Sequence, residues 1–129
     1  MLKSNSLNSE SFGSMYSVLR LLCRNKDGLQ ICHLNAQSLS PKIDEFRHIF
    51  EKSGVDVICV SETWLNSNKL DSLVEVRGYS LVRADRISHA GGVAMFVKSS
   101  IPFKFICKSP CDSEVEYLFI EISSVHQKF

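Results

Sequence analysis

The sequence lacks a long apolar run that could cross a membrane. The only apolar stretch near the start, residues 15–23 (MYSVLRLLC), is interrupted by Arg20. It is well short of the roughly 20 residues that a transmembrane helix needs. A secretory signal would place small residues after such a stretch, whereas residues 24–27 read RNKD. We expect a short amphipathic helix or a segment outside the fold, and neither a membrane span nor a signal peptide.

An excess of charge of one sign is also absent. Fifteen basic residues stand against fourteen acidic ones, and the net charge is +1. This balance gives no overall electrostatic attraction to nucleic acid or to an acidic membrane. Lys98, Lys104 and Lys108 lie in the last third of the chain. They form either a local basic patch or, as ordinary surface composition favours, separate solvated side chains.

No regular disulfide framework is present. The five cysteines are Cys23, Cys32, Cys59, Cys107 and Cys111, an odd number that we interpret as reduced thiols in an intracellular protein. Cys32 and Cys59 lie within apolar runs, where a free cysteine behaves as a small buried hydrophobe. Cys107 and Cys111 match half of a zinc site, but no second pair of ligands follows at a suitable spacing, so we expect no zinc.

The composition that is present is that of a soluble globular protein, with 44% hydrophobic and 22% charged residues. A chain of 129 residues suits one domain. Residues 1–14 are rich in Ser and Asn and have few apolar side chains to offset the entropy of ordering. We therefore divide the chain into a flexible N-terminal segment, residues 1–28, and a folded domain, residues 29–129.

Residues 30–60 have the pattern of a strand, a helix and a second strand. Residues 30–34 (QICHL) form a short apolar run, and residues 55–60 (VDVICV) form a nearly continuous β-branched run. Such a run is typical of a strand covered on both faces in a parallel sheet. A right-handed crossover through the intervening helix would make the two strands parallel neighbours.

The helix is predicted over residues 41–53, because it has both a start and a stop signal. Ser40 suits the N-cap, Pro41 suits the first helical position, and two acidic residues follow early. Gly54 suits the C-terminal end. One apolar face repeats at helical spacing and consists of Ile43, Phe46, Ile49 and Phe50.

The second half of the chain has an antiparallel β pattern. Residues 66–72 are polar and predict a loop. A strand is predicted over residues 78–83, and Gly91-Gly92 separates it from an antiparallel partner over residues 93–97 (VAMFV). Two further strands are predicted near residues 103–107 and 117–122, on either side of Pro110 and an acidic segment. The fold class is α/β first and then mainly antiparallel β.

Asn35 and Glu62 follow the two strands that we expect to be parallel. In open α/β sheets, ligands bind outside the carboxyl ends of the strands. Neighbouring strands lie about 5 Å apart, so an amide and a carboxylate would share one rim. Hard oxygen ligands of this kind suit Mg²⁺. Local turns in which these side chains only cap the following loop are the alternative.

Five segments of the sequence resemble the endonuclease/exonuclease/phosphatase superfamily in their order and spacing. Their amino-acid sequences are most similar to the N-terminal endonuclease of jockey-like non-LTR retrotransposons. The resemblance runs from Leu29 to Ile122. The segments are HLNAQSL (33–39), PKIDEF (41–46), VDVICVSETWL (55–65), GYSLVRADR (78–86) and GGVAMFV (91–97).

The resemblance implies a fold and a reaction. The fold is the four-layer α/β sandwich of this superfamily, of which the chain would supply mainly one sheet with its crossover helix. The reaction is Mg²⁺-dependent phosphodiester hydrolysis, in which the metal polarises the phosphate and an aspartate and histidine pair activates water. In the retrotransposon branch this reaction nicks target DNA in the nucleus. The implied cofactor is Mg²⁺, and the implied partner is DNA.

The resemblance also implies roles for single residues. Glu62 would be a direct Mg²⁺ ligand, and Asn35 would help to position the metal and the scissile phosphate. Thr63 and Trp64 would shape the same loop, with Trp64 mainly a packing residue.

Basic residues and histidines near the glycine pair are less decisive. Arg83 and Arg86 match a segment that would approach DNA phosphates, but an Arg83–Asp85 pair that only braces the hairpin is equally compatible. His33 and His89 are not at the position of the family's catalytic histidine, and we interpret both as incidental. The family pattern has three glycines where this chain has Ala90-Gly91-Gly92. Alanine there is tolerable unless its backbone needs a positive φ.

We expect the remaining family motifs, a Tyr-x-Pro-like segment, Asp-x-Asn and Ser-Asp-His, to lie beyond Phe129. The chain would then be an N-terminal fragment that is inactive alone, since the water-activating pair would be missing. One sheet face would be uncovered and would favour self-association. The alternatives are a non-catalytic DNA- or protein-binding half-domain, or a fragment of another superfamily phosphatase or repair nuclease.

Overall fold

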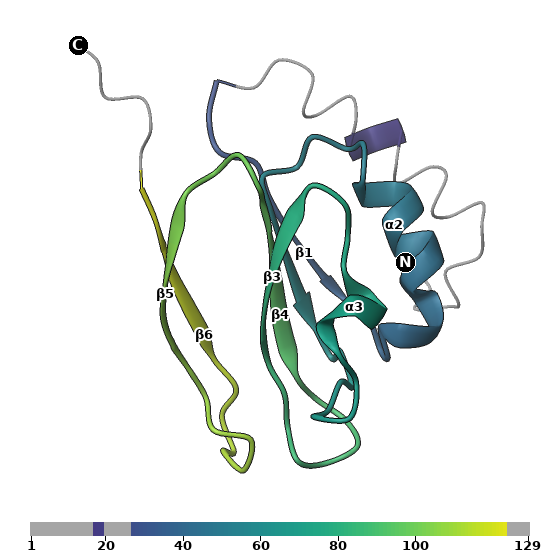
Figure 1. Ribbon diagram of the computed structural model, residues 1–129, viewed down its shortest axis with the longest axis vertical. Coiled ribbons are helices and arrows are strands. Elements are labelled where there is room, and N and C mark those ends of the chain that lie inside the picture. Colours follow the sequence, from purple (N-terminus) through teal and green to yellow (C-terminus); the bar gives the residue numbers. More distant parts are fainter. Residues whose placement is uncertain (1–16, 20–26, 124–129) are drawn as a thin grey trace, which may run out of the picture.

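A computed structural model describes residues 17–19 and 27–123. Figure 1 shows a four-stranded sheet with a helix on one side and a separate two-stranded hairpin on the other. The elements in chain order are β1 (Ile31–Asn35), η1 (Ser40–Lys42), α2 (Ile43–Phe50), β2 (Val57–Ser61), α3 (Asp71–Val74), β3 (Tyr79–Ala84), β4 (Val93–Lys98), β5 (Phe103–Lys108) and β6 (Leu118–Ile122).

The predicted strand–helix–strand unit is confirmed. β1 and β2 pair in parallel, with Ile31 opposite Val57 and Asn35 opposite Ser61. The second strand begins at Val57, two residues later than predicted. Asp56 lies just before it, where its Oδ2 accepts a hydrogen bond of 2.8 Å from the backbone N–H of Gln30. Asp56 therefore ties the start of β2 to the residue before β1.

The predicted helix forms, with one error at its start. Ser40 is not the N-cap: Leu39 already has helical dihedral angles, so Ser40 lies inside the first turn of η1. Its buried Oγ has no hydrogen-bond partner among the described residues. Pro41 is in the first turn as predicted, and α2 ends at Phe50 with a turn over residues 51–53. Gly54 follows with a φ of 82°, as a C-terminal glycine should.

The predicted antiparallel strands are also confirmed. β4 pairs antiparallel with both β2 and β3, and the order in the sheet is β1-β2-β4-β3. β5 and β6 form a separate antiparallel pair with an irregularity between Phe105 and Cys107. The short helix α3, in the connection before β3, has no counterpart in the prediction. The described residues form a mixed α/β fold with six strands in two sheets.

The core lies between α2 and one face of the four-stranded sheet. The predicted apolar face of the helix, from Ile43 to Phe50, is buried there. The ring of Phe46 packs against that of Phe96 on β4, with 5.1 Å between ring centroids. Residues 17–19 are helical, and Leu19 packs against the same core.

The opposite face of the sheet is only partly covered. Side chains alternate along β1, so Ile31, His33 and Asn35 point away from α2. Ile31 is 60% exposed. The β5–β6 hairpin approaches this face near Leu118, which is buried, while Phe119 beside it is 56% exposed. Within the described residues no helix is long and apolar enough to span a membrane.

Candidate functional site

The ends of β1 and β2 form one rim, as their parallel pairing requires. Asn35 lies opposite Ser61, the residue before Glu62. The two following loops stay paired, because the N–H of Ala36 binds the carbonyl of Ser61 at 2.9 Å and the N–H of Ser38 binds that of Glu62 at 3.0 Å. The predicted juxtaposition of the two strand ends is therefore confirmed, and we call these two loops the strand-end corner.

The backbone of the strand-end corner is strained. In the described part of the chain, the non-glycine residues with positive φ are Gln37, Ser38, Glu62 and Trp64. Each such conformation costs about 1–3 kcal/mol and persists only where surrounding contacts enforce it. All four residues belong to the loops that follow β1 and β2. This concentration of strain marks the strand-end corner as a functional-site candidate independently of any motif.

The Glu62 carboxylate is held by one of its two oxygens. Oε2 accepts hydrogen bonds from Trp64 Nε1 at 2.8 Å and from the backbone N–H of Gly91 at 3.3 Å. Oε1 accepts no hydrogen bond from the residues that the structure describes. The side chain is therefore fixed in orientation and keeps one hard oxygen available. Trp64 has a direct role in this arrangement that the packing interpretation did not include.

Asn35 is fixed by a local turn. Its Oδ1 accepts a hydrogen bond of 3.1 Å from the backbone N–H of Gln37. A local turn was the alternative to a ligand role in the sequence analysis. The turn that forms uses only one acceptor position of the side-chain amide. Oδ1 has a second lone pair, and the two Nδ2 hydrogens can donate to an anion. Asn35 is exposed, so both groups face solvent at the rim.

The glycine pair holds the loop after β2 in place. The carbonyl of Gly91 accepts a hydrogen bond of 2.8 Å from the backbone N–H of Trp64. The carbonyl of Gly92 accepts one of 3.2 Å from the backbone N–H of Thr63. Both glycines have a φ near 90°, at 88° and 91°. A Cβ at Gly92 would collide with the Thr63 hydroxyl. Ala90 has no positive φ, so the alanine in place of the family's first glycine is compatible with the turn.

Glu116 is a site residue that the sequence analysis missed. Its Oε2 accepts a hydrogen bond from the N–H of Gly92, and its Oε1 pairs with Arg86 Nη1 at 3.3 Å. The side chain is only 18% exposed. Position 116 lies far along the chain, within an acidic segment that separates two strands. Its sequence context gives no signal that distinguishes it from the neighbouring Glu114.

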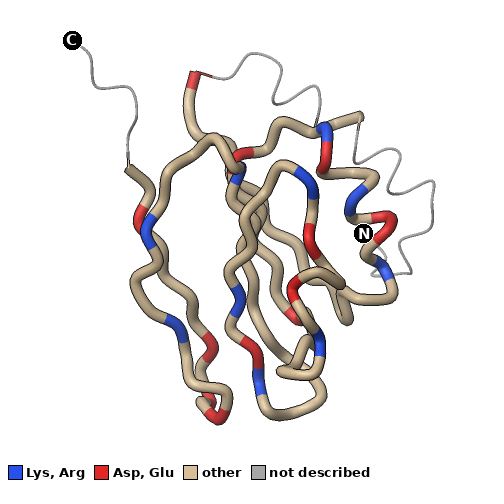
Figure 2. Tube along the Cα trace, viewed as in Figure 1, with Lys and Arg blue, Asp and Glu red and all other residues tan. Residues whose placement is uncertain are grey.

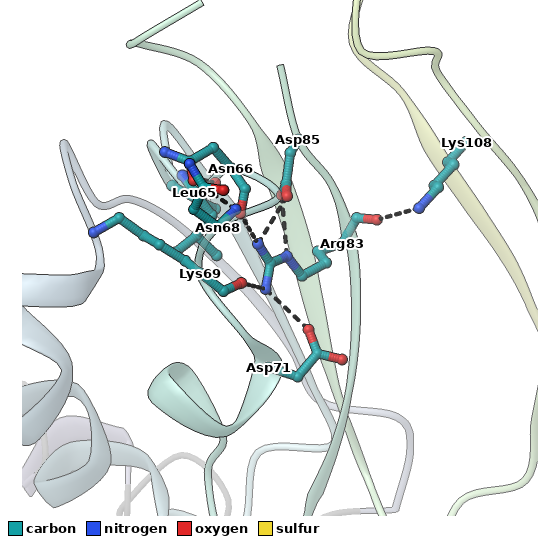
Figure 3. A network of polar contacts seen from close by, with 9 residues as sticks. Leu65, Asn66, Asn68, Lys69, Asp71, Arg83, Asp85 and Lys108 are labelled. Atoms are coloured by element: carbon teal, nitrogen blue, oxygen red, sulfur yellow. Dashed lines mark hydrogen bonds and ion pairs between the residues drawn. The ribbon is translucent and has the colours of Figure 1, made fainter. Parts of the chain in front are cut away.

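Arg83 is the centre of a polar network (Figure 3). Its guanidinium binds both carboxylate oxygens of Asp85, at 3.1 and 2.7 Å, and Asp71 at 2.9 Å. The carbonyls of Asn66 and Lys69 accept its two other N–H groups. All five donors of this arginine are thus satisfied within the chain. Burial would lower the pKa of Arg83, but the hydrogen bonds and charges of Asp85 and Asp71 outweigh it and raise the pKa.

This geometry favours bracing over DNA contact for Arg83, because no donor is left for a phosphate. Arg86 is different, since its side chain is 36% exposed and, among the described residues, its guanidinium pairs with Glu116 through Nη1. Basic and acidic residues are interspersed along the chain (Figure 2). Lys104 on β5, for example, lies opposite Glu121 on β6. Lys104 and Lys108 are exposed and Lys98 is half-buried, and the Nζ of Lys108 donates to the carbonyl of Arg83 at 3.3 Å.

Both histidines of the sequence analysis lie near the strand-end corner. Nε2 of His33 is 3.2 Å from the Ser61 hydroxyl, and the His89 ring lies against Trp64 with 5.2 Å between centroids. An open cleft of about 190 Å³ adjoins His33 and Ser61. It lies between the sheet face opposite α2 and the start of β6, and its lining includes Met95, Glu116 and Leu118.

The model of the Endonuclease/Exonuclease/phosphatase family matches residues 8–123. The chain belongs to this family. The match covers the whole strand-end corner, the glycine pair and Glu116, and it also includes most of the segment predicted to precede the fold. A search of curated proteins finds no match.

Members of this nuclease and phosphatase family generally depend on a divalent metal. The oxygens of Glu62 and Asn35 fit such an ion, because Mg²⁺ takes one or two carboxylates and keeps several waters. The described residues contain no group of three or more His, Cys, Asp or Glu side chains that could hold a metal ion. Within the described residues, Glu62 is the carboxylate that the strand ends place at this rim. The four cysteines among the described residues are free thiols.

Proposed function

We propose that this chain supplies the metal side of the active site of a Mg²⁺-dependent DNA endonuclease, of the type carried by jockey-like non-LTR retrotransposons. The observation that supports it most is the Glu62 carboxylate, which is anchored through Oε2 and open at Oε1 at the end of a parallel strand.

Each residue of the strand-end corner has a task in this proposal. Glu62 would hold Mg²⁺, which when bound supplies Lewis-acid stabilisation of charge on a phosphate. Trp64 and Gly91 fix the carboxylate before any ligand arrives, so that little ordering is needed on binding. Asn35, fixed by its turn, presents its Nδ2 hydrogens to a phosphate oxygen.

DNA as the substrate is supported by the order of motifs and by the position of Arg86. This arginine is held by Glu116 beside the glycine pair, is partly exposed and lies in the segment that follows β3. A single phosphate contact there would be sensitive to salt, because counterions are released on binding. We propose a nuclear site of action on the same grounds.

We propose that the 129-residue chain does not hydrolyse DNA by itself. Within the described residues, His33 contacts a serine and His89 contacts an aromatic ring, and neither is paired with a carboxylate. General acid–base catalysis contributes about 10²–10⁴-fold, so the loss of a water-activating pair removes most of the rate.

The test separates metal binding from turnover. Isothermal titration with Mg²⁺ should show one weak site in the purified chain, and Glu62→Gln should abolish it. Glu51→Gln, an exposed glutamate at the end of α2, should leave it unchanged. Absence of Mg²⁺ binding in the wild-type chain would contradict the proposal.

A plasmid-nicking assay with Mg²⁺ addresses turnover and should be blank. Nicking that disappears in Glu62→Gln but persists in Glu51→Gln would overturn the inactivity and support the endonuclease.

A non-catalytic binding module is the second candidate, and the partly uncovered sheet face around Ile31 favours it. Electrophoretic mobility shift with duplex DNA distinguishes the two. Binding that needs Mg²⁺ and is lost in Glu62→Gln supports the endonuclease. Binding that is unchanged by Glu62→Gln and by metal removal supports the module.

A further inference from the structure

The carboxylate of Glu116 lies at the far end of a chain of hydrogen bonds that leads to Glu62. Its Oε2 accepts from the N–H of Gly92, while its Oε1 pairs with Arg86. Glu116 comes from the segment before β6, about fifty residues beyond Glu62 in sequence. None of the motifs that indicate the metal side of the site includes it.

One peptide group links Glu116 to the loop after β2. The N–H of Gly92 and the carbonyl of Gly91 belong to the same planar peptide unit. Glu116 binds the N–H side of that unit, and the N–H of Trp64 binds its carbonyl side at 2.8 Å. Hydrogen bonds at both ends of a peptide polarise one another and fix its plane. Glu116 therefore orients the group that holds the Trp64 backbone.

The same turn contacts the Glu62 carboxylate directly. The N–H of Gly91 donates to Glu62 Oε2 at 3.3 Å, and so does the indole of Trp64 at 2.8 Å. Both donors belong to residues that contact this peptide, because Gly91 supplies its carbonyl and the backbone N–H of Trp64 binds that carbonyl. The side chains of Glu116 and Arg86 also pack closely on Gly91, since a Cβ there would lie 2.7 Å from Glu116 Oε1 and 2.5 Å from Arg86 Cδ.

We infer that Glu116 is a positioning residue for the metal ligand Glu62, acting through the Gly91–Gly92 peptide and Trp64. The role of Glu62 as a metal ligand rests on the proposed function. The contacts of Glu116 with the glycine pair and Arg86 do not depend on it. The carboxylate orients the donors that fix Glu62 Oε2, and Oε1 accepts no hydrogen bond from the described residues. Arg86 holds the other oxygen of Glu116, so the arginine beside the site and the Glu62 loop share one support.

The chain offers a specific reporter for this coupling. Trp64 is its only tryptophan, so a ¹⁵N-labelled sample gives a single indole N–H signal by NMR. That proton is donated to Glu62 Oε2. Its chemical shift and its exchange with solvent report the Glu62–Trp64 bond in the metal-free chain, and its response to Mg²⁺ reports ligand binding at Glu62.

The experiment compares Glu116→Ala with Glu114→Ala in the full 129-residue chain. Glu114 is exposed and lies in the same segment, which makes it a matched control. In Glu116→Ala we expect the metal-free indole signal to move toward the position of a solvated indole and to exchange faster. The dissociation constant for Mg²⁺ should rise about 10-fold, as is usual when a residue that orients a ligand is removed. Glu114→Ala should change neither quantity.

Glu116→Gln separates a positioning role from a purely structural one. Its amide oxygen can still accept from Gly92, while its charge toward Arg86 is lost. We expect an indole signal between those of the wild type and Glu116→Ala, with partial recovery of the Mg²⁺ affinity. If Glu116→Ala loses its dispersed methyl signals, Glu116→Gln supplies the same two readings. Loss of the fold in both variants would overturn the inference, because it would assign Glu116 to folding alone.

Two further outcomes are distinct. If the indole signal of Glu116→Ala matches that of Glu114→Ala, the positioning role is overturned, whatever the Mg²⁺ affinities of the two variants. The indole signal could instead move in Glu116→Ala while the wild-type chain shows no response to Mg²⁺. That result would retain the coupling through Glu116 and reject the proposed metal function.

Discussion

The indole Nε1 of Trp64 donates a hydrogen bond of 2.8 Å to the Oε2 of Glu62, two residues earlier in the chain. This contact requires an unusual backbone, and both residues have positive φ, at 56° and 54°. The tryptophan thus does more than fill space beside the strand end. It fixes the side chain that we propose as the metal ligand.

Replacement of Trp64 by Phe should loosen Glu62 without removing an aromatic ring. Because a hydrogen bond to a charged acceptor is lost, we expect the free energy of unfolding to fall by about 1–2 kcal/mol. The Mg²⁺ affinity should fall about 10-fold. Tyr117→Phe is the control, since that exposed residue also loses one polar group. Calorimetric titration and urea unfolding measure both quantities, and identical results for the two variants would contradict the role of the indole.

Replacement of Gly92 by Ala should disrupt the turn that holds the loop after β2. Its φ of 91° is unfavourable for alanine, and the new Cβ would collide with the buried Thr63 hydroxyl. We expect a loss of about 1–3 kcal/mol in the free energy of unfolding. Gly28→Ala is the matched change, because nothing lies within 4 Å of that position and its φ is not in the left-handed region. Thermal unfolding should show a decrease for the first variant only.

Replacement of Arg83 by Lys tests whether this arginine braces the chain. A lysine ammonium cannot reproduce five donors in a planar fork. We expect a loss of about 2–3 kcal/mol in stability, since the side chain is 12% exposed and its carboxylate partners would lose a charge-assisted contact.

Arg77→Lys, at an exposed arginine near the start of β3, should be neutral. A variant at Arg83 with unchanged stability and weaker DNA binding would instead assign the guanidinium to a phosphate.

The stability of the protein should fall at alkaline pH through Cys59. Burial raises the pKa of this thiol above its ordinary value of 9.0. The folded chain therefore retains the proton where the unfolded chain has lost it. The contribution is fully present below about pH 9 and is lost as the pH rises through the raised pKa of the folded state.

Urea unfolding between pH 7.5 and 10 should show this decline, and Cys59→Ala should flatten it. Cys107→Ala is the control, because Cys107 is exposed. An equal slope in the wild type and in Cys59→Ala would exclude the thiol as the cause.

Self-association should depend on the partly uncovered sheet face. Ile31 on β1 is 60% exposed and points away from α2, and we propose that a second copy of the chain covers this face. Sedimentation velocity should show an average mass that rises with concentration, and Ile31→Lys should shift it toward the monomer. Leu70→Lys, at a 71% exposed leucine on the loop before α3, should not. A wild-type chain that is monomeric at every concentration would refute the proposal.

Local patterns were sufficient to locate most of the elements. The β-branched run before Glu62, the apolar face of α2 and the glycines after the helix and before β4 each act through the nearest residues, so their signals are visible in the sequence. Element ends were less accurate. Ser40 lies inside the first turn because Leu39 is already helical, and β2 starts at Val57 because Asp56 is tied to Gln30.

The sequence by itself determined the family, the parallel neighbours β1 and β2, and the place of Asn35 and Glu62 at their ends. The rule that parallel strands end on one rim needs only the order of the elements.

The tertiary structure alone decided how those side chains are held. Glu116 reaches Gly92 from the segment before β6, and Arg83 closes on two aspartates and the loop before α3. Such contacts join residues far apart in the chain, and their energy depends on the direction of each donor and acceptor, which composition and spacing do not specify.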